Sequence, residues 1–132
     1  MSFAQFTDDL KVGHEEIDRQ HEALYDIVNR LHDAMRSGQS RKDQGAILSF
    51  LGTYTVEHFA AEEALMEGAQ YPGLEAHRAE HRQLLHQFEE LQQKYETGSM
   101  TLSIMVMHFL KDWLSHHIQE VDRRLADHLR QG

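Results

Sequence analysis

Cysteine is absent from the 132 residues of this chain. That absence excludes disulfides, thiolate zinc sites, iron–sulfur clusters and cysteine nucleophiles together. Proline occurs once and glycine eight times, so collagen-like and low-complexity classes are excluded as well. The longest apolar run is four residues, Ile104 to Met107, far short of the ~20 that a membrane-spanning helix needs. The chain also begins without a recognisable targeting signal, so we expect a cytoplasmic protein with no membrane partner.

Basic residues are scarce, while histidine is abundant. Lys and Arg total 13 against 22 Asp and Glu, which leaves a net charge of -9. Nucleic-acid binding needs a basic surface, so no nucleic-acid partner is expected. The 11 histidines are nearly as many as the Lys and Arg residues combined. Histidine is the commonest metal ligand among side chains, which directs attention to a metal site.

Apolar residues recur with helical period in four segments, at about 15–35, 43–67, 74–97 and 101–129. Short breaks separate them, at Gly38, at the turn 71–73 and at Gly98. Four helices of ~20 residues joined by short loops predict an all-α, antiparallel up-down-up-down four-helix bundle. We expect one domain over residues 1–132, with an N-terminal arm at 1–14 and the bundle at 15–129.

Several positions on the apolar faces of these helices are polar. In the second segment, for example, His58 and Glu62 are four residues apart between Leu51 and Leu65, so their side chains stack on the core face. The complete core-facing polar set is His21, His58, Glu62, His77, His81, His117 and Asp122.

The last two members of this set rest on a choice within the fourth segment. Spacing alone favours His116 with Glu120, which are four residues apart. The apolar stripe favours His117, which lies three residues after Leu114 and four before Val121, and turns His116 toward water. His117 and Asp122 are five residues apart, roughly 140° around an ideal helix, which makes this the weakest geometric link.

A single buried histidine is commonly a hydrogen-bonded core residue. Seven buried polar side chains from four helices, with no Lys or Arg on the same faces, instead need a shared partner, and a metal centre supplies one. The set exceeds one tetrahedral zinc site and differs from the all-oxygen ligands of calcium or magnesium. Mixed nitrogen and oxygen ligands in a bundle favour two iron or manganese ions. Two six-coordinate metals sharing two bridging carboxylates and one oxygen bridge would keep one position open.

These residues occur in motifs that resemble the hemerythrins, in particular the stand-alone bacterial members. The motifs follow the family order and span nearly the whole chain: Ile17-Asp18-Arg19-Gln20-His21, His58-Phe59-Ala60-Ala61-Glu62-Glu63, His77-Arg78-Ala79-Glu80-His81, and Trp113-Leu114-Ser115-His116-His117-Ile118 running to Asp122. The five-residue step from His117 to Asp122 is also the step of the family.

The resemblance implies a non-haem, oxo- or hydroxo-bridged centre of two iron ions with dioxygen as its ligand. By resemblance, His77, His81 and His117 would hold one iron. His21 and His58 would hold the other, which carries the open position, and Glu62 and Asp122 would bridge both. An apolar pocket would exclude water, and its expected wall is Leu24, Phe59, Trp113, Leu114 and Ile118, although ordinary core packing also accounts for these residues.

The function that the resemblance implies is reversible dioxygen binding for transport, storage or delivery, without catalysis. An oxygen-using enzyme is a conceivable recipient, and a monomer or weak oligomer is expected. The alternatives are an oxygen or redox sensor, a di-iron scavenger of peroxide or nitric oxide, and a labile iron store. Oxidising di-iron bundles typically carry four carboxylates and two histidines, so five histidines with two carboxylates favour reversible binding.

Neighbouring polar residues are candidates to support the ligands. Glu63 and Asp18 are both placed to accept a hydrogen bond from a ligand imidazole. His14 would approach the site only if the first helix began early, which Gly13 opposes.

Overall fold

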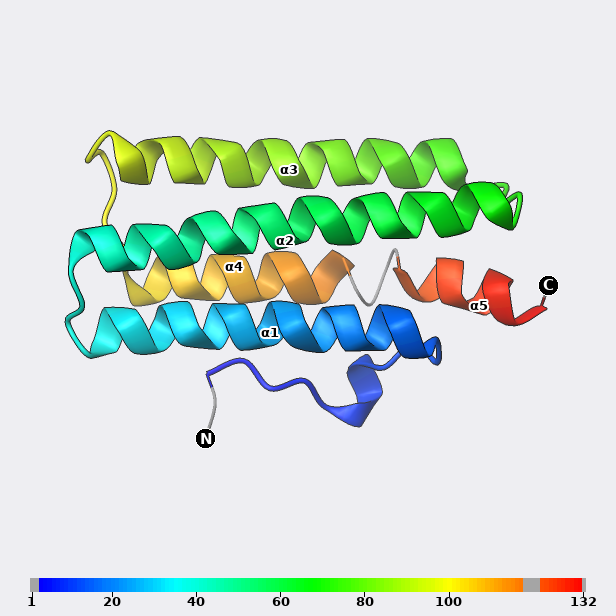
Figure 1. Cartoon of the computed structure of the whole chain (residues 1–132), viewed down its shortest axis with the longest axis horizontal. Helices are drawn as coiled ribbons and strands as arrows, with labels where there is room; N and C mark the ends of the chain where they lie inside the picture. Colours follow the sequence, from blue (N-terminus) through cyan, green and yellow to red (C-terminus); the bar gives the residue numbers. More distant parts are fainter. Residues whose placement is uncertain (1–2, 118–121, 132) are drawn as a thin grey trace.

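The computed structural model describes residues 3–117 and 122–131 of the chain. In chain order its helices are the short 3-10 helix η1 (Asp8–Leu10), α1 (Glu15–Arg36), α2 (Arg41–Gly68), α3 (Leu74–Glu96), α4 (Ile104–His116) and α5 (Arg123–Gln131). Long helices run antiparallel, with α1 packed on α2, α2 on α3 and α1 on α4 (Figure 1). The predicted all-α four-helix bundle is confirmed.

Serine side chains cap the first turns of α2 and α4. Ser40 Oγ accepts a hydrogen bond from the Asp43 amide at 3.1 Å, and Ser103 Oγ accepts one from the Val106 amide at 3.3 Å. Each serine satisfies an amide that the first helical turn leaves without a partner. The cap at Ser103 explains why α4 begins at Ile104, three residues after the start that periodicity predicts.

The first break shows the glycine chemistry that ends a helix. Gly38 follows α1 with a φ of 73°, in the left-handed region that costs glycine little. Because the backbone changes direction at Gly38, the Gln39 amide donates a hydrogen bond to the Ala34 carbonyl at 3.0 Å, which satisfies an oxygen at the end of α1.

The stretch predicted as one helix is helical on both sides of residues 118–121. Two helices occupy this stretch: α4 ends at His116 and α5 begins at Arg123, with residues 118–121 outside the described part of the chain. His117 and Asp122, the described residues nearest that gap, are both in π-helical conformation. Apolar periodicity alone does not distinguish this departure from a continuous α-helix.

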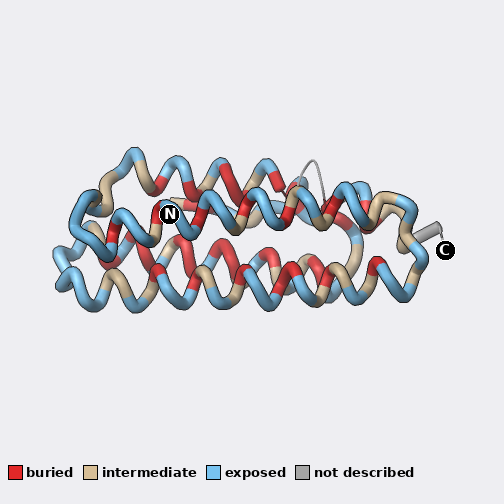
Figure 2. Tube along the Cα trace, turned by 90° about the horizontal axis from the view of Figure 1, so that it is seen from above, coloured by how far each residue is buried: buried red, intermediate tan, exposed pale blue. Residues whose placement is uncertain are grey.

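The core has two chemically different halves. Near the α1–α2 loop it is apolar, with Leu31, Leu48, Leu91 and Met107 almost fully buried. Near the opposite end, buried histidines and carboxylates take the place of apolar side chains. Buried positions face inward along every long helix (Figure 2). The apolar half can therefore hold the bundle together while the other half holds polar groups.

The N-terminal arm packs against α1. Asn29 holds Ala4 in both directions: the Ala4 amide donates to Oδ1 at 2.7 Å, and Nδ2 donates to the Ala4 carbonyl at 2.8 Å. Leu10 and Val12 of the arm join the buried core. Within the described residues, every helix falls short of the length or apolar character that crossing a membrane requires.

The contact between Gly52 and Phe88 makes a prediction about packing. A Cβ at Gly52 would lie 2.6 Å from a ring carbon of the buried Phe88, whereas one at the exposed Gly68 would meet nothing within 4 Å. Gly52→Ala should lower the free energy of unfolding by about 1–3 kcal/mol, because overpacking outweighs the gain in helix propensity. The matched Gly68→Ala should change it by less than about 0.5 kcal/mol. Urea unfolding of both variants measures this, and equal stability of the two would contradict the packing.

Candidate metal centre

Seven buried polar side chains meet at the end of the bundle where α1 and α3 begin. None is more than 2% exposed, and they come from every long helix: His21 from α1, His58 and Glu62 from α2, His77 and His81 from α3, His117 after α4, and Asp122 before α5. Their donor atoms form two groups, each with all atoms within 4.8 Å of one another, and both groups contain Glu62 and Asp122. The structure thus brings together the whole set that the sequence singled out.

Asp122 lies between two sets of imidazoles. Its Oδ2 is 2.5 Å from His21 Nε2 and 3.4 Å from His58 Nε2. Its Oδ1 is 3.1 Å from His77 Nε2 and 2.8 Å from His117 Nε2. One carboxylate oxygen therefore faces a pair of histidines while the other faces a different pair.

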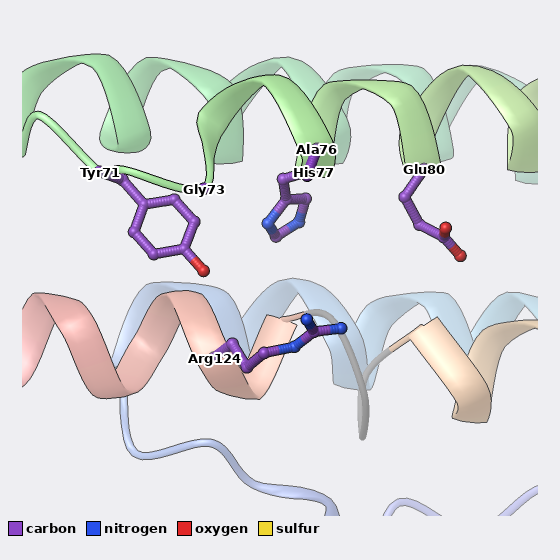
Figure 3. Close-up of a pocket in the computed structure, with 6 residues that line it drawn as sticks. All are labelled: Tyr71, Gly73, Ala76, His77, Glu80 and Arg124. Carbon is purple, nitrogen blue, oxygen red and sulfur yellow. The ribbon is translucent and has the colours of Figure 1, made fainter.

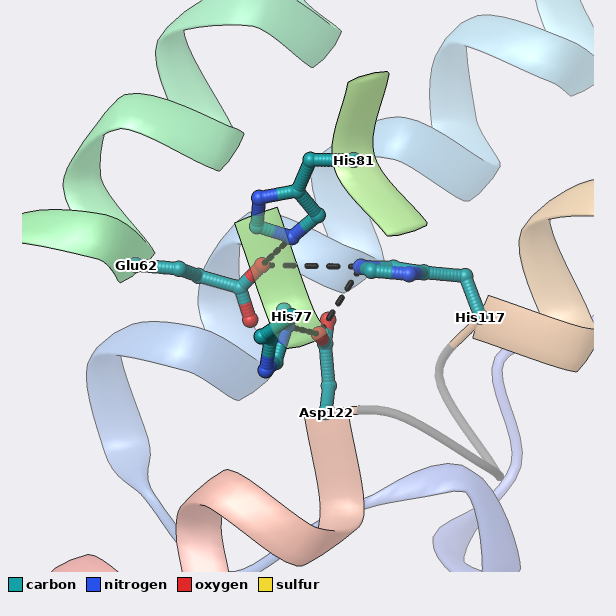
Figure 4. Close-up of side chains that lie close together, drawn as sticks. All are labelled: Glu62, His77, His81, His117 and Asp122. Carbon is teal, nitrogen blue, oxygen red and sulfur yellow. Dashed lines mark hydrogen bonds and ion pairs between the residues drawn. The ribbon is translucent and has the colours of Figure 1, made fainter. Parts of the chain in front are cut away.

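The second carboxylate of the cluster, Glu62, also lies among several imidazoles. Its Oε1 is 3.2 Å from His81 Nε2 and 3.5 Å from His117 Nε2 (Figure 4). The same oxygen is 3.3 Å from His58 Nε2. His58 and Glu62 are one turn apart on α2, which places both on the same face of that helix. Glu62 thus contacts histidines from both groups, as Asp122 does.

The structure shows how His117 and Asp122, the pair whose spacing fits an α-helix least well, lie relative to one another. The two residues are five apart in the chain. In an α-helix the same step would turn them roughly 140° apart. The 2.8 Å approach of His117 Nε2 to Asp122 Oδ1 confirms that the two side chains converge.

Burial sets the charge states of the cluster. It lowers the pKa of His58 to about 4, and burial with the neighbouring His117 and His77 lowers the pKa of His81 to about 2. Burial also raises the pKa of Glu62 well above its usual range, with the Asp122 carboxylate adding to the effect. For Asp122, burial opposes ionisation, but the facing histidines outweigh it and hold the pKa well below its usual range. His58 and His81 are therefore neutral at pH 7, as metal binding requires.

Several polar atoms of the cluster make no hydrogen bond, although Glu62 Oε1, His81 Nε2 and His117 Nε2 lie at ion-pair distance from other members. The buried side-chain atoms that find no hydrogen bond among the described residues are His21 Nδ1, Glu62 Oε1 and Oε2, His81 Nε2, and His117 Nδ1 and Nε2. Most buried polar atoms in proteins are hydrogen-bonded, so this concentration is costly unless a further group satisfies it. Imidazole nitrogens and carboxylate oxygens converging within a few ångströms can hold metal ions.

Side chains outside the cluster contact the Nδ1 atoms of two imidazoles, whose Nε2 atoms face the cluster. Glu63 Oε2 lies 3.0 Å from His81 Nδ1, so the prediction for Glu63 is confirmed. Gln20 Oε1 accepts a hydrogen bond from His58 Nδ1 at 2.6 Å. Sequence reasoning missed Gln20, for which the only sequence signal was its place next to His21.

The prediction for Asp18 is wrong. Its carboxylate accepts hydrogen bonds from the Val12 amide at 2.7 Å and the Gly13 amide at 3.2 Å, and so anchors the arm. His14 caps α1 by accepting from the Ile17 amide, because the helix begins only at Glu15. His116 is exposed, as the apolar stripe predicts.

An apolar pocket adjoins the cluster and is too tight to hold a water molecule. Its lining is Leu24, Thr55, Phe59, Leu84, Trp113, Leu114 and His117. Four of the five expected wall residues are in this set, and the fifth, Ile118, lies outside the described residues. The Phe59 ring stacks on His81, with 3.8 Å between centroids. Trp113 Nε1 donates to the Leu84 carbonyl at 3.3 Å, which fixes the indole.

A second pocket, of about 280 Å³, opens on the surface between α3 and α5. It is polar and is lined by Tyr71, Gly73, Ala76, His77, Glu80 and Arg124 (Figure 3). One imidazole of the cluster, that of His77, therefore borders a surface pocket large enough for water, whereas His117 borders the tight apolar one.

Comparison with known proteins places this arrangement in a family. Residues 12–129 match the model of the hemerythrin HHE cation binding domain. The chain is 38% identical over 106 residues to the bacteriohemerythrin of Methylococcus capsulatus, covering 80% of each. It is 34% identical over 130 residues to the bacteriohemerythrin of Stenotrophomonas maltophilia, covering 98% of this chain and 84% of the relative.

The fold agrees with this relationship. The crystal structure of a wild-type hemerythrin superposes with a TM-score of 0.89 at 32% identity, covering 97% of this chain and 98% of the other. The chain therefore belongs to the hemerythrin family.

The buried Glu62 carboxyl makes a prediction about the metal-free protein. Glu62→Leu should raise the free energy of unfolding by about 1–3 kcal/mol, because burying this carboxyl is costly and its long contacts of 3.2–3.5 Å with imidazole nitrogens offset only part of that cost. Glu57→Leu, at an exposed position of the same helix, should change it by less than about 0.5 kcal/mol. Urea unfolding in the presence of a chelator measures both variants. A loss of several kcal/mol in Glu62→Leu would mean that the carboxyl has a structural partner.

Proposed function

We propose that this chain binds dioxygen reversibly at a pair of iron ions in the buried cluster. The observation that carries the proposal is that the two carboxylate oxygens of Asp122 face different histidines. In this assignment His77, His81 and His117 would hold one iron, and His21 and His58 would hold the other. Glu62 and Asp122 would contact both. The membership of the chain in the hemerythrin family supports the choice of iron and dioxygen.

The ligand count assigns different tasks to the two metals. With both carboxylates shared, the metal held by His21 and His58 has one protein ligand fewer than its partner. It therefore carries the open position. A ferrous pair supplies the electrons that dioxygen takes up on binding. The protein's own task is to hold both ions in place and to keep water from the bound gas.

The apolar pocket would perform the second task. Its lining is mostly apolar, and two of its polar groups are already engaged: the Thr55 hydroxyl donates to the Leu51 carbonyl, and the Trp113 indole nitrogen donates to the Leu84 carbonyl. Excluding water limits the proton supply that would release reduced oxygen and leave the iron ferric. We propose that the wall of the dioxygen site consists of Leu24, Phe59, Trp113 and Leu114, with Ile118 as the untested fifth.

A binding role is favoured over catalysis by the ligand balance. Five imidazoles with two carboxylates supply less negative charge than the four-carboxylate sets of oxidising di-iron bundles. Less charge stabilises the ferric and higher states less strongly, which favours release of dioxygen over its activation. Delivery to an oxygen-using enzyme and a monomeric or weakly oligomeric state stay predictions.

Iron analysis with visible spectroscopy tests the proposal. The purified protein should hold two irons per chain, lose colour on anaerobic reduction, and gain a visible band in oxygen that disappears when oxygen is removed. Chelation should lower the melting temperature, because metal bound only by the folded state stabilises it. Irreversible passage to the ferric form at the first exposure to oxygen would contradict reversible binding.

The apolar pocket makes a further prediction about the lifetime of the reduced protein. Leu24→Thr introduces a hydroxyl into the pocket wall and should speed irreversible oxidation in air, about tenfold or more. Leu31→Thr introduces the same hydroxyl two turns along α1, at an equally buried site in the apolar half, and should not change the rate. Stopped-flow absorbance measures both. Equal oxidation rates in the two variants would show that Leu24 does not help to exclude water from the dioxygen site.

A further inference from the structure

The two metal positions differ in the groups that stand behind their histidines. His58 and His81 each turn Nε2 toward Glu62, at 3.3 and 3.2 Å, and Nδ1 toward a side-chain oxygen outside the cluster. One of these histidines belongs to each metal of the proposed pair. The structure therefore supports one imidazole per metal through its second nitrogen.

Behind His81 the support carries a negative charge. The Glu63 carboxylate places Oε2 3.0 Å from His81 Nδ1, and its other oxygen accepts from Arg78 Nε at 3.1 Å. Arg78 also contacts Glu67 and Glu75, so the guanidinium is held from several sides. The carboxylate is thereby fixed in the position that accepts the imidazole proton.

Behind His58 the support is neutral. Gln20 places its amide oxygen 2.6 Å from His58 Nδ1, while its amide nitrogen donates to Glu16 Oε1 at 3.0 Å. Glu16 in turn pairs with Arg19 at 2.6 Å. The contact with Glu16 fixes which end of the amide faces His58. The Glu16–Arg19 ion pair therefore does not contact His58 directly, because the Gln20 amide lies between them.

This difference has a definite electronic consequence. A hydrogen bond to a carboxylate makes an imidazole more basic and strengthens its donation to a metal, which favours the higher oxidation state. An amide oxygen does the same more weakly because it carries no net charge. The metal held by His21 and His58 thus receives less support for oxidation than the metal held by His77, His81 and His117.

We propose that Gln20 and Glu63 are positioning residues that give the two metals different reduction potentials. The neutral amide of Gln20 keeps the metal with the open position in its reduced, gas-binding state, while Glu63 favours oxidation of its partner. This inference rests on the proposed function, because it requires a metal at each position. It adds a reason why an amide, and not a second carboxylate, contacts His58.

Spectroelectrochemical titration of the iron-loaded protein tests the inference. Gln20→Glu should lower one of the two midpoint potentials and speed oxidation in air about tenfold. Glu63→Gln should raise the other midpoint potential. Gln83→Glu is the matched control, because it adds the same charge two residues from His81 at an exposed position. This control should leave both potentials close to those of the unmodified protein.

Zinc affinity supplies a readout without redox chemistry. Measured by chelator competition, affinity should rise in Gln20→Glu and fall about tenfold in Glu63→Gln. Unmodified protein that fails to hold two irons would overturn the proposed function itself. Unmodified protein that holds two irons and binds dioxygen, with potentials that move equally in Gln20→Glu and Gln83→Glu, would overturn this inference alone.

Discussion

The structure depends on burying seven ionisable side chains in one part of the bundle core. Such groups are costly in a protein interior unless they share a partner, and several of their polar atoms make no hydrogen bond. Histidines and carboxylates interleaved within a few ångströms relieve part of this cost through mutual contacts, and metal ions would relieve the rest. The remainder of the bundle therefore has to be stable enough to tolerate this region and rigid enough to keep it assembled.

The arrangement of the helices meets both demands. The apolar half of the core supplies stability at a distance from the cluster, and the polar half draws its side chains from α1, α2, α3 and the residues next to α4 and α5. No short segment of sequence holds the site alone, so the site exists only in the folded bundle. Supports outside the cluster, such as Glu63 with Arg78 and Gln20 with Glu16, then orient the imidazoles against rotation.

The sequence sufficed for the bundle and for the cluster, because helical periodicity makes a polar residue on an apolar face conspicuous. His117 was separated from His116 in this way. Other features depend on tertiary contacts that periodicity does not contain. Asp18 lies three residues before His21 and is chemically suited to support an imidazole, but its carboxylate binds amides of the arm. Gln20 was missed because a glutamine beside a candidate ligand shows no role until α2 packs against it. The departure from regular α-helix at His117 and Asp122 was likewise invisible, since apolar spacing continues across it.

The central claim is that the cluster holds two metal ions with Glu62 and Asp122 between them. Anomalous diffraction at the iron edge, from crystals of the iron-loaded protein, tests this most directly. The account predicts two peaks, one beside His77, His81 and His117 and one beside His21 and His58, with Asp122 contacting both. A single peak, or peaks away from these histidines, would contradict the account.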